Sequence, residues 1–374
     1  MSEKHDQLQT FLKKLISAPG LSGYEGPVRE LIEEAWRPLT DELHVSRLGS
    51  LHGLRRGSLS KAQPANGKAP SLLLAGHMDS IGLMVTAVTE GLLGVTEVGG
   101  LDPRVLPGQL VSVHGREELP GVIVQPPAHL LPKDLRDRPA PLKYLWVDTG
   151  LLPSEVERLV RVGDLVSFAQ PPIELGNELL AGHTLDDRAA VAAITYCLQE
   201  LQGRELAWDL WAVATVQEEE TLGGAFTSAF ELRPDLAVAI DVTFGSGPGS
   251  PSHGTFPIGK GITLGWGPNI HPALHNTFKE LADRLEIPYK LEPVPGNSGT
   301  DAIGLQVTAE GIPTAILSIP LRYMHTPVEM VSMKDITRAG RLLAEFAVQL
   351  DEHFMEKLQW DHEAKQHGKH NNGQ

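Results

Sequence analysis

Histidine and carboxylate residues that could hold metal ions directly follow several apolar runs of this sequence. With the run that each follows, they are His77 and Asp79 (after 72–75), Glu218 and Glu219 (after 210–216), Asp241 (after 236–240) and His325 (after 314–319). Continuous apolar runs are typical of strands buried on both faces, and the carboxyl ends of strands in an open α/β sheet form active sites. We therefore expect these side chains to converge.

A further carboxylate, Asp186, stands between a turn-like segment at 182–185 and a helix-like segment. Its two oxygens could each bind one cation. A set of histidines and carboxylates suits zinc, cobalt or manganese, and a pair of such ions serves hydrolysis by polarising a carbonyl and activating water. The proton of that water needs an acceptor that binds no metal, so either Glu218 or Glu219 must be free for this role.

Each of these groups has an ordinary interpretation when it is taken alone. A His-x-Asp pair is commonly just hydrogen-bonded, and an aspartate such as Asp186 is favoured at the start of a helix. Three successive glutamates at 218–220 would commonly form a solvated loop. The coincidence of all of them at strand ends or at a helix start favours the metal site.

The elements that must position these groups are predicted from apolar periodicity. Helical spacing at 5–17 and 28–36 precedes the first apolar run, and an alanine-rich helix is predicted for 186–201. Residues 85–174 are rich in Val, Gly and Pro and show repeated strand-like pieces, which indicates an inserted β-rich domain. The predicted fold class is therefore α/β, a mixed-sheet catalytic domain interrupted by a smaller, barrel-like β domain.

The length supports more than one domain, because a single core stops growing near roughly 250–300 residues. We predict a catalytic domain in two parts, 1–83 and 177–354, an inserted β-rich domain at 84–176, and a disordered tail at 355–374. The tail carries His362, His367 and His370, which could bind metal adventitiously, and it is given no catalytic role.

Composition excludes several classes of protein. Hydrophobic residues make up 41% and charged residues 21% of the chain, with no apolar run long enough for a membrane helix. The net charge of −15 disfavours nucleic acid as a partner, because phosphate backbones bind clustered Lys and Arg. Cys197 is the only cysteine, which excludes a disulfide within the chain and a four-thiolate metal site. The polar start of the chain favours a cytoplasmic protein over a secreted one.

The motifs around these groups resemble the signature blocks of the glutamyl aminopeptidase and tetrahedral aminopeptidase family, some members of which have been labelled endoglucanases. The main blocks are Gly-His-Met-Asp (76–79), Leu-Asp-Asp-Arg (185–188), Gln-Glu-Glu (217–219), Ile-Asp-Val-Thr (240–243) and Met-His-Thr-Pro (324–327), with smaller ones at 20–25, 99–105 and 299–302. The blocks occur in the family's order and cover nearly the whole chain except the tail.

The resemblance implies a role for each residue and an assembly for the chain. It implies that Asp186 bridges two divalent metal ions, zinc or cobalt with manganese as an alternative, that His77 and Asp241 complete one ion, and that Glu219 and His325 complete the other. Glu218 becomes the general base, and Asp79 orients the ring of His77. The family also implies short peptides as substrates, a role in assembly for the inserted domain at 84–176, and a homo-oligomer built from dimers, which could assemble into a tetrahedral dodecamer.

Four residues in family blocks are candidates for the substrate pocket, namely Thr300, Asp301, Arg322 and Tyr323. The chain departs from the family pattern at Ser80, where Glu is common, at Glu220-Thr221, where Val-Gly commonly follows the glutamate pair, and at Gly49-Ser50, where Gly-Asn is usual. None of these residues is an inferred ligand, so the departures at Ser80 and Glu220 bear on substrate choice rather than on metal binding.

Other functions stay open from the sequence. A deacylase or a carboxypeptidase could use the same pair of metals on a related fold, and a scaffold could keep the fold without catalysis. A glycosidase is less favoured, because its two carboxyl groups must flank a sugar bond, whereas Glu218 and Glu219 are adjacent and the two histidines would have no role.

Overall fold

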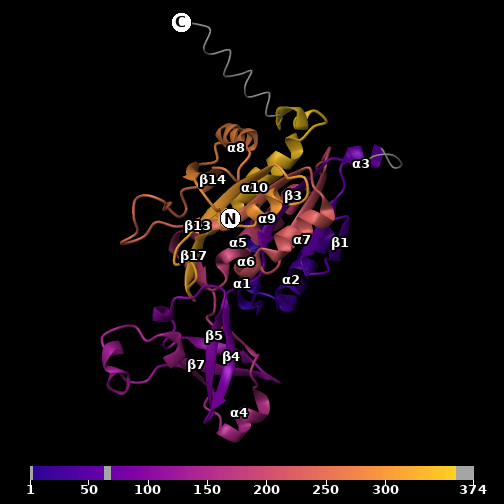
Figure 1. Cartoon of the computed structure of the whole chain (residues 1–374). Coiled ribbons are helices and arrows are strands. Elements are labelled where there is room, and N and C mark those ends of the chain that lie inside the picture. The colour runs from indigo at the N-terminus through magenta and orange to yellow at the C-terminus, as the bar shows by residue number, and fades with distance from the viewer. Residues whose placement is uncertain (1–2, 63–68, 359–374) are drawn as a thin grey trace.

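The main sheet carries the predicted apolar runs as its central strands in a computed structural model that describes residues 3–62 and 69–358 (Figure 1). Its order is β1-β2-β12-β3-β13-β16-β14-β15. Strands β3, β12, β13 and β16 run parallel, whereas β1, β2 and β14 introduce antiparallel pairs. The bounds are β1 (Glu42–Val45), β2 (Leu51–Arg55), β3 (Ser71–His77), β12 (Asp209–Thr215), β13 (Leu236–Phe244), β14 (Ile262–Trp266), β15 (Tyr289–Pro293) and β16 (Thr314–Leu321).

Helices cover both faces of this sheet, which explains why its central strands are apolar throughout. One face packs against α1 (Glu3–Ser17), α2 (Gly26–Trp36), α5 (Leu185–Glu200), α8 (Pro272–Arg284) and α10 (Met333–Gln349). The other packs against α7 (Gly223–Leu232) and α9 (Ala302–Gln306). Two further short helices are α3 (Ser58–Ala62) and α6 (Glu218–Thr221).

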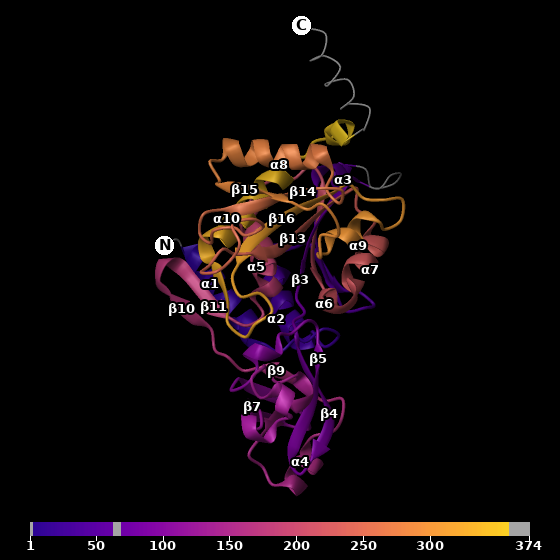
Figure 2. The same ribbon diagram turned by 60° about the vertical axis from the view of Figure 1, so that its left-hand side comes forward.

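A closed six-stranded barrel projects from one end of this α/β core (Figures 1 and 2). Its order is β4-β5-β8-β7-β6-β9, all antiparallel, and it has a separate apolar interior. The bounds are β4 (Gly82–Thr89), β5 (Leu92–Val98), β6 (Leu110–His114), β7 (Glu118–Val124), β8 (Trp146–Asp148), β9 (Leu165–Phe168) and helix α4 (Pro153–Leu159). The predicted fold class, a mixed-sheet α/β core interrupted by a barrel-like β domain, is confirmed.

A small antiparallel sheet returns the chain from the barrel to the core. It contains β10 (Ile173–Leu175), β11 (Leu179–Gly182) and β17 (Glu329–Ser332), in that order. Near the chain's end, the short helix η7 (Phe354–Leu358) buries Phe354 and Leu358 against the core, so it occupies the first residues of the predicted tail. The rest of that tail lies outside the described residues. Within the described part of the chain, no helix is long and apolar enough to cross a membrane.

Helices α5 and α10 approach closely because Gly340 has no side chain. A Cβ at this position would lie 2.5 Å from the carbonyl oxygen of Ala193 and 3.0 Å from side-chain atoms of Tyr196. Since α5 carries Asp186 in its first turn and rests on β3, this contact supports the element that carries the central carboxylate of the candidate site.

We expect Gly340→Ala to lower the free energy of unfolding by about 1–3 kcal/mol, because the backbone contact cannot yield without separating the helices. Alanine's better helix propensity, worth up to about 1 kcal/mol, would act in the opposite direction. Urea unfolding measures the difference, with the exposed neighbour changed in Arg341→Ala as the matched control. A stability equal to or above that of the unmodified protein would show that the helices separate at little cost.

Candidate metal centre

The predicted groups come together at the carboxyl edge of the main sheet. His77 is the last residue of β3, and the backbone of Gln217, in the left-handed region, turns the chain from β12 into α6 with Glu218 and Glu219. Asp241 lies within β13, and His325 lies in the connection from β16 to β17. Asp186 completes the group from the start of α5.

Asp186 stands between the two histidines. Its Oδ1 lies 3.2 Å from Nε2 of His77, and its Oδ2 lies 3.5 Å from Nε2 of His325. Nε2 of His325 is also 3.4 Å from Oε2 of Glu219, and Nε2 of His77 is 3.7 Å from Oε2 of Glu218. One carboxylate therefore presents a different oxygen to each histidine, as a bridge between two ions requires.

Asp79 supports the cluster from beneath, since its side chain is completely buried. Its Oδ1 lies 3.3 Å from Nδ1 of His77, and its two oxygens accept hydrogen bonds from the backbone N–H groups of Glu218 (3.0 Å) and Glu219 (3.2 Å). A carboxylate in this position fixes the orientation of a ligating histidine. It also holds the backbone of Glu218 and Glu219 in place, and this second role of Asp79 was not predicted from the sequence.

Two further carboxylates of the centre had no predicted role. Glu329, the buried first residue of β17, accepts hydrogen bonds from the backbone N–H groups of Asp186 (3.0 Å) and His325 (2.9 Å). Asp187 accepts a hydrogen bond from the backbone N–H of His77 at 3.3 Å. The sequence offered one signal for each residue: Asp187 directly follows a predicted ligand, and Glu329 begins a short apolar strand.

Two overlapping groups have side-chain atoms close enough to hold an ion. The ligand atoms of His77, Asp186 and Glu219 all lie within 4.8 Å of one another, and so do those of His77, Asp187 and Asp241. The second group contains Asp187, so this carboxylate is a possible ligand that the sequence analysis left out.

Burial leaves the negative charge of this cluster poorly compensated. It raises the pKa of Glu218 to about 9, and it raises the pKa of Glu219 and of Asp241 well above the usual range. Asp186 differs: burial acts to raise its pKa, but hydrogen bonds from His325 and His77 outweigh that effect and lower it. The hydrogen bond to Asp186 raises the pKa of His325 to about 9. Divalent cations would provide the missing positive charge.

A cleft of about 470 Å³ opens over the cluster. Of the four residues predicted for a substrate pocket, Thr300 lines this cleft. Asp301 is buried and accepts a hydrogen bond from Oγ1 of Thr215 (2.5 Å), while Nε of Arg322 donates to the carbonyl oxygen of Ser246 (2.6 Å). The side chain of Tyr323 is about half exposed. The last three are not among the lining residues.

Neither Ser80 nor Glu220, two departures from the family pattern, lines the cleft. The hydroxyl of Ser80 is buried and donates to the carbonyl oxygen of Gly20 at 3.0 Å. Oε1 of Glu220 accepts a hydrogen bond from the backbone N–H of Gly99 at 2.7 Å, which joins the end of the first barrel hairpin to the glutamate segment.

A buried set of histidines and carboxylates at the carboxyl edge of an α/β sheet is typical of metal-dependent hydrolases. Comparison with known proteins agrees, since the model of the M42 glutamyl aminopeptidase family matches residues 57–342. The chain belongs to this family of metal-dependent peptide-bond hydrolases.

Individual relatives support the same conclusion. The lysyl aminopeptidase of Pyrococcus furiosus is 35% identical over 88% of this chain and 94% of its own. A TET aminopeptidase from the marine archaeon Thaumarchaeota archaeon SCGC AB-539-E09 has a TM-score of 0.87 and 30% identity, covering 95% of this chain and 99% of that one. A TET peptidase of Pyrococcus horikoshii, which can assemble into a tetrahedron or a large octahedral shell, has a TM-score of 0.79 and 29% identity, covering 92% and 100%.

Glu329 generates a prediction about metal retention. In Glu329→Gln, an amide that accepts at only one atom would face two backbone N–H donors, so Asp186 and His325 would lose part of their support. We expect metal affinity to fall about 10–100-fold, as is usual when a group that orients ligands is lost.

The measurement is the chelator concentration that removes half of the bound metal, followed by elemental analysis. Glu310→Gln, which changes an exposed glutamate paired with Arg233, is the matched control. Retention of metal equal to the control would mean that Glu329 does not hold the centre together.

Proposed function

We propose that this protein is a two-metal aminopeptidase that removes residues from the free amino end of short peptides. The observation that carries the proposal is the position of Asp186, whose two oxygens face two different histidines. Family membership supports the hydrolysis of peptide bonds. The histidines and carboxylates on both sides of Asp186 support two metal ions.

In this proposal Asp186 would be shared by two divalent ions, which would be zinc or cobalt, with manganese as an alternative. His77 and Asp241 would help to hold one ion, and Glu219 and His325 would help to hold the other. The residues fit such ions because all of the donors are nitrogen or carboxylate oxygen, and because their burial raises the cost of leaving the carboxylates unpaired.

Divalent ions at this position supply Lewis acidity and lower the pKa of water. Glu218 acts as the general base that takes the proton from the attacking water and then, as the acid, gives it to the leaving amine. Burial raises the pKa of Glu218, and divalent cations beside it would lower that pKa again, so that the carboxylate can accept the proton of the water. Asp79 keeps Glu218 in place through the backbone N–H that it accepts.

Other functions differ in their substrates. A deacylase or carboxypeptidase would act on peptides with a blocked amino end, and a non-catalytic scaffold would act on none. A glucanase needs two carboxyl groups about 5–9.5 Å apart on either side of a sugar bond. Glu218 and Glu219 are instead neighbours in α6 that share one supporting aspartate, and the two histidines of the site would be unexplained.

We expect Glu218→Gln to lose at least about 10²-fold in kcat while metal content stays unchanged, because the variant removes the proton acceptor and no proposed ligand. Release of amino acids from aminoacyl-p-nitroanilides measures the effect, on protein stripped by chelator and reloaded with zinc or cobalt. Glu310→Gln, which changes an exposed glutamate outside the cleft, is the matched control.

Amino-blocked peptides belong in the same panel. Metal-dependent cleavage of only the unblocked substrates would support the aminopeptidase. Cleavage of blocked substrates would instead indicate a deacylase or carboxypeptidase. A protein that binds metal and cleaves no substrate would indicate a non-catalytic scaffold.

We also propose that the cleft prefers a basic amino-terminal side chain. Glu292 of β15 lines the cleft, and its two oxygens accept hydrogen bonds from the hydroxyls of Thr243 and Thr263, both at 2.5 Å. These bonds hold the carboxylate in one orientation, with one threonine on the adjacent strand β14 and the other on β13, which lies beyond β16 in the sheet. Among the residues that the structure describes, neither lysine nor arginine lines the cleft. An anchored carboxylate with no basic side chain beside it in the cleft favours a substrate with Lys or Arg over one with Glu.

This preference predicts the behaviour of Glu292→Gln. The rate constant kcat/KM for lysyl-p-nitroanilide should fall about 10-fold, whereas that for leucyl-p-nitroanilide should change little, because only the first substrate pairs with the carboxylate. Glu280→Gln, an exposed change on α8, is the control. An equal loss of kcat/KM for both substrates would show that Glu292 maintains the structure of the cleft and does not determine specificity.

Assembly and location are the remaining parts of the proposal. The TET relatives named above support a homo-oligomer of this chain, built from dimers that could form a tetrahedral dodecamer. A cytoplasmic location stays a prediction from the sequence.

A further inference from the structure

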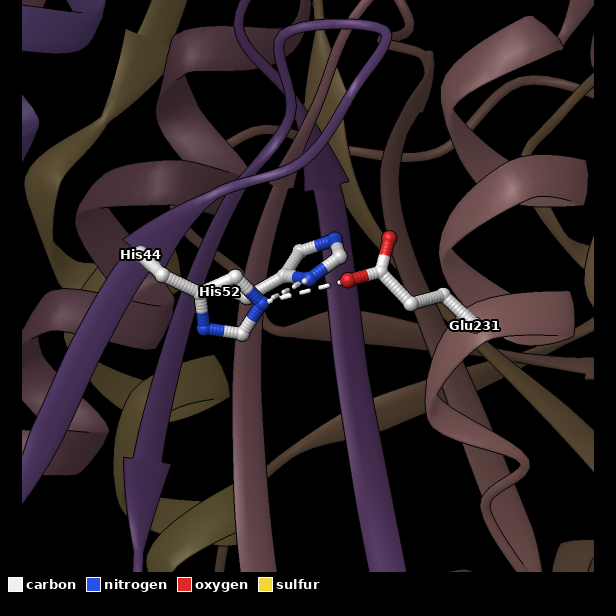
Figure 3. A group of neighbouring side chains, drawn as sticks. All are labelled: His44, His52 and Glu231. Atoms are coloured by element: carbon white, nitrogen blue, oxygen red, sulfur yellow. Dashed lines mark hydrogen bonds and ion pairs between the residues drawn. The ribbon is translucent and has the colours of Figure 1, made fainter.

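A second cluster of side chains that could hold a metal ion lies between the edge hairpin of the main sheet, β1–β2, and helix α7. It joins His44 of β1, His52 of β2 and Glu231 of α7 (Figure 3). His44 and His52 are directly opposed in the antiparallel register of the hairpin, so their rings project from the same face. Glu231, near the end of α7, points toward them from the helix that covers this face.

The distances suit one tetrahedral ion. Nε2 of His44 lies 3.2 Å from Nδ1 of His52 and 3.4 Å from Oε1 of Glu231, and the three atoms lie within 4.8 Å of one another. Zinc bonds of about 2.0–2.1 Å place neighbouring tetrahedral ligands about 3.3–3.4 Å apart. Two of the three edges therefore already have the length that a bound ion would impose.

A neighbouring hydroxyl orients the buried histidine. Nε2 of His52 is 2.8 Å from Oγ of Ser228, one helical turn before Glu231 on α7. With Nε2–H donating to that hydroxyl, Nδ1 carries a lone pair directed at His44, as in ligating histidines held by an outer hydrogen bond. The Trp211 ring meets both imidazoles edge-on, with centroids at 6.0 and 6.5 Å, and limits their rotation.

An ion could enter this cluster from solvent. The side chain of His52 is fully buried, whereas those of His44 and Glu231 are 42% and 44% exposed. Three protein ligands with an open side leave a fourth position for water or another ligand. None of the three residues lines the catalytic cleft.

We propose that His44, His52 and Glu231 form an additional site for a borderline divalent cation, of which zinc is the probe of choice. An ion there would clamp the edge hairpin β1–β2 to α7. Helix α7 begins two residues after the end of α6, which contains Glu218 and Glu219, so the ion would restrain the helix next to the glutamate pair. The site does not depend on the proposed peptidase mechanism.

The test counts ions per chain. The full-length protein carries His362→Asn, His367→Asn and His370→Asn throughout, so that tail histidines cannot contribute. It is stripped by chelator, dialysed against buffered micromolar zinc and measured by elemental analysis. We expect His44→Gln and Glu231→Gln each to bind about one zinc ion per chain fewer than the parent.

His353→Gln is the matched control, because His353 is an exposed histidine beside two glutamates outside the cluster. The prediction concerns a difference between variants, so it holds whether the catalytic cleft binds two ions, one or none. Folding is checked by circular dichroism, and His52 is left unchanged because it is buried.

A zinc count in His44→Gln and Glu231→Gln equal to the parent would overturn the proposal and leave a hydrogen-bonded cluster. An equal loss in His353→Gln would also overturn it, since the ions would then be held by surface histidines in general. As a second readout, zinc should raise the melting temperature of the parent more than that of His44→Gln.

Discussion

The concentration of buried negative charge at one edge of the sheet is the constraint on which the rest of the structure depends. Burial raises the pKa of Glu219 and of Asp241, whereas hydrogen bonds from two histidines lower that of Asp186, so cations would favour the ionised form of the first two. Two histidines on either side of Asp186 offset part of that charge. The remainder explains why a site of this composition fits divalent metal ions and why the carboxylates need rigid support.

That support comes from backbone groups and one buried cation. Asp79 and Glu329 each accept two backbone N–H groups of residues at the centre, so the positions of the donors depend on the main chain around them. Beneath them, the completely buried Arg188 of α5 donates to the carbonyl oxygens of Met78 (3.2 Å) and Ala18 (2.7 Å). Helix α5 thus supplies both the central carboxylate and the cation that joins β3 to the amino-terminal helices.

The sequence predicted those parts of the molecule that follow from local patterns. Apolar runs at 72–75, 210–216, 236–240 and 314–319 became central strands, and the group at their ends converged as parallel strands require. Glu329 and Glu292 were missed because their positions depend on how distant strands pair: Glu292 acquires its two threonine partners only when β15 lies beyond β14. The opposition of His44 and His52 likewise depends on a hairpin register that the sequence alone did not specify.

The inserted barrel takes part in the site as well as in the architecture. The segment that leaves its first hairpin carries Gly99, whose N–H bonds to Glu220, and Gly100, where a Cβ would lie 3.2 Å from Nδ1 of His325. Backbone of the insertion therefore packs directly against a predicted ligand and beside the glutamate pair. Because Gly99 adopts a φ of +74° and a Cβ there would lie 2.5 Å from Ile81, this approach requires glycine. A movement of the barrel relative to the core would consequently change the positions of His325 and of the segment that carries Glu219.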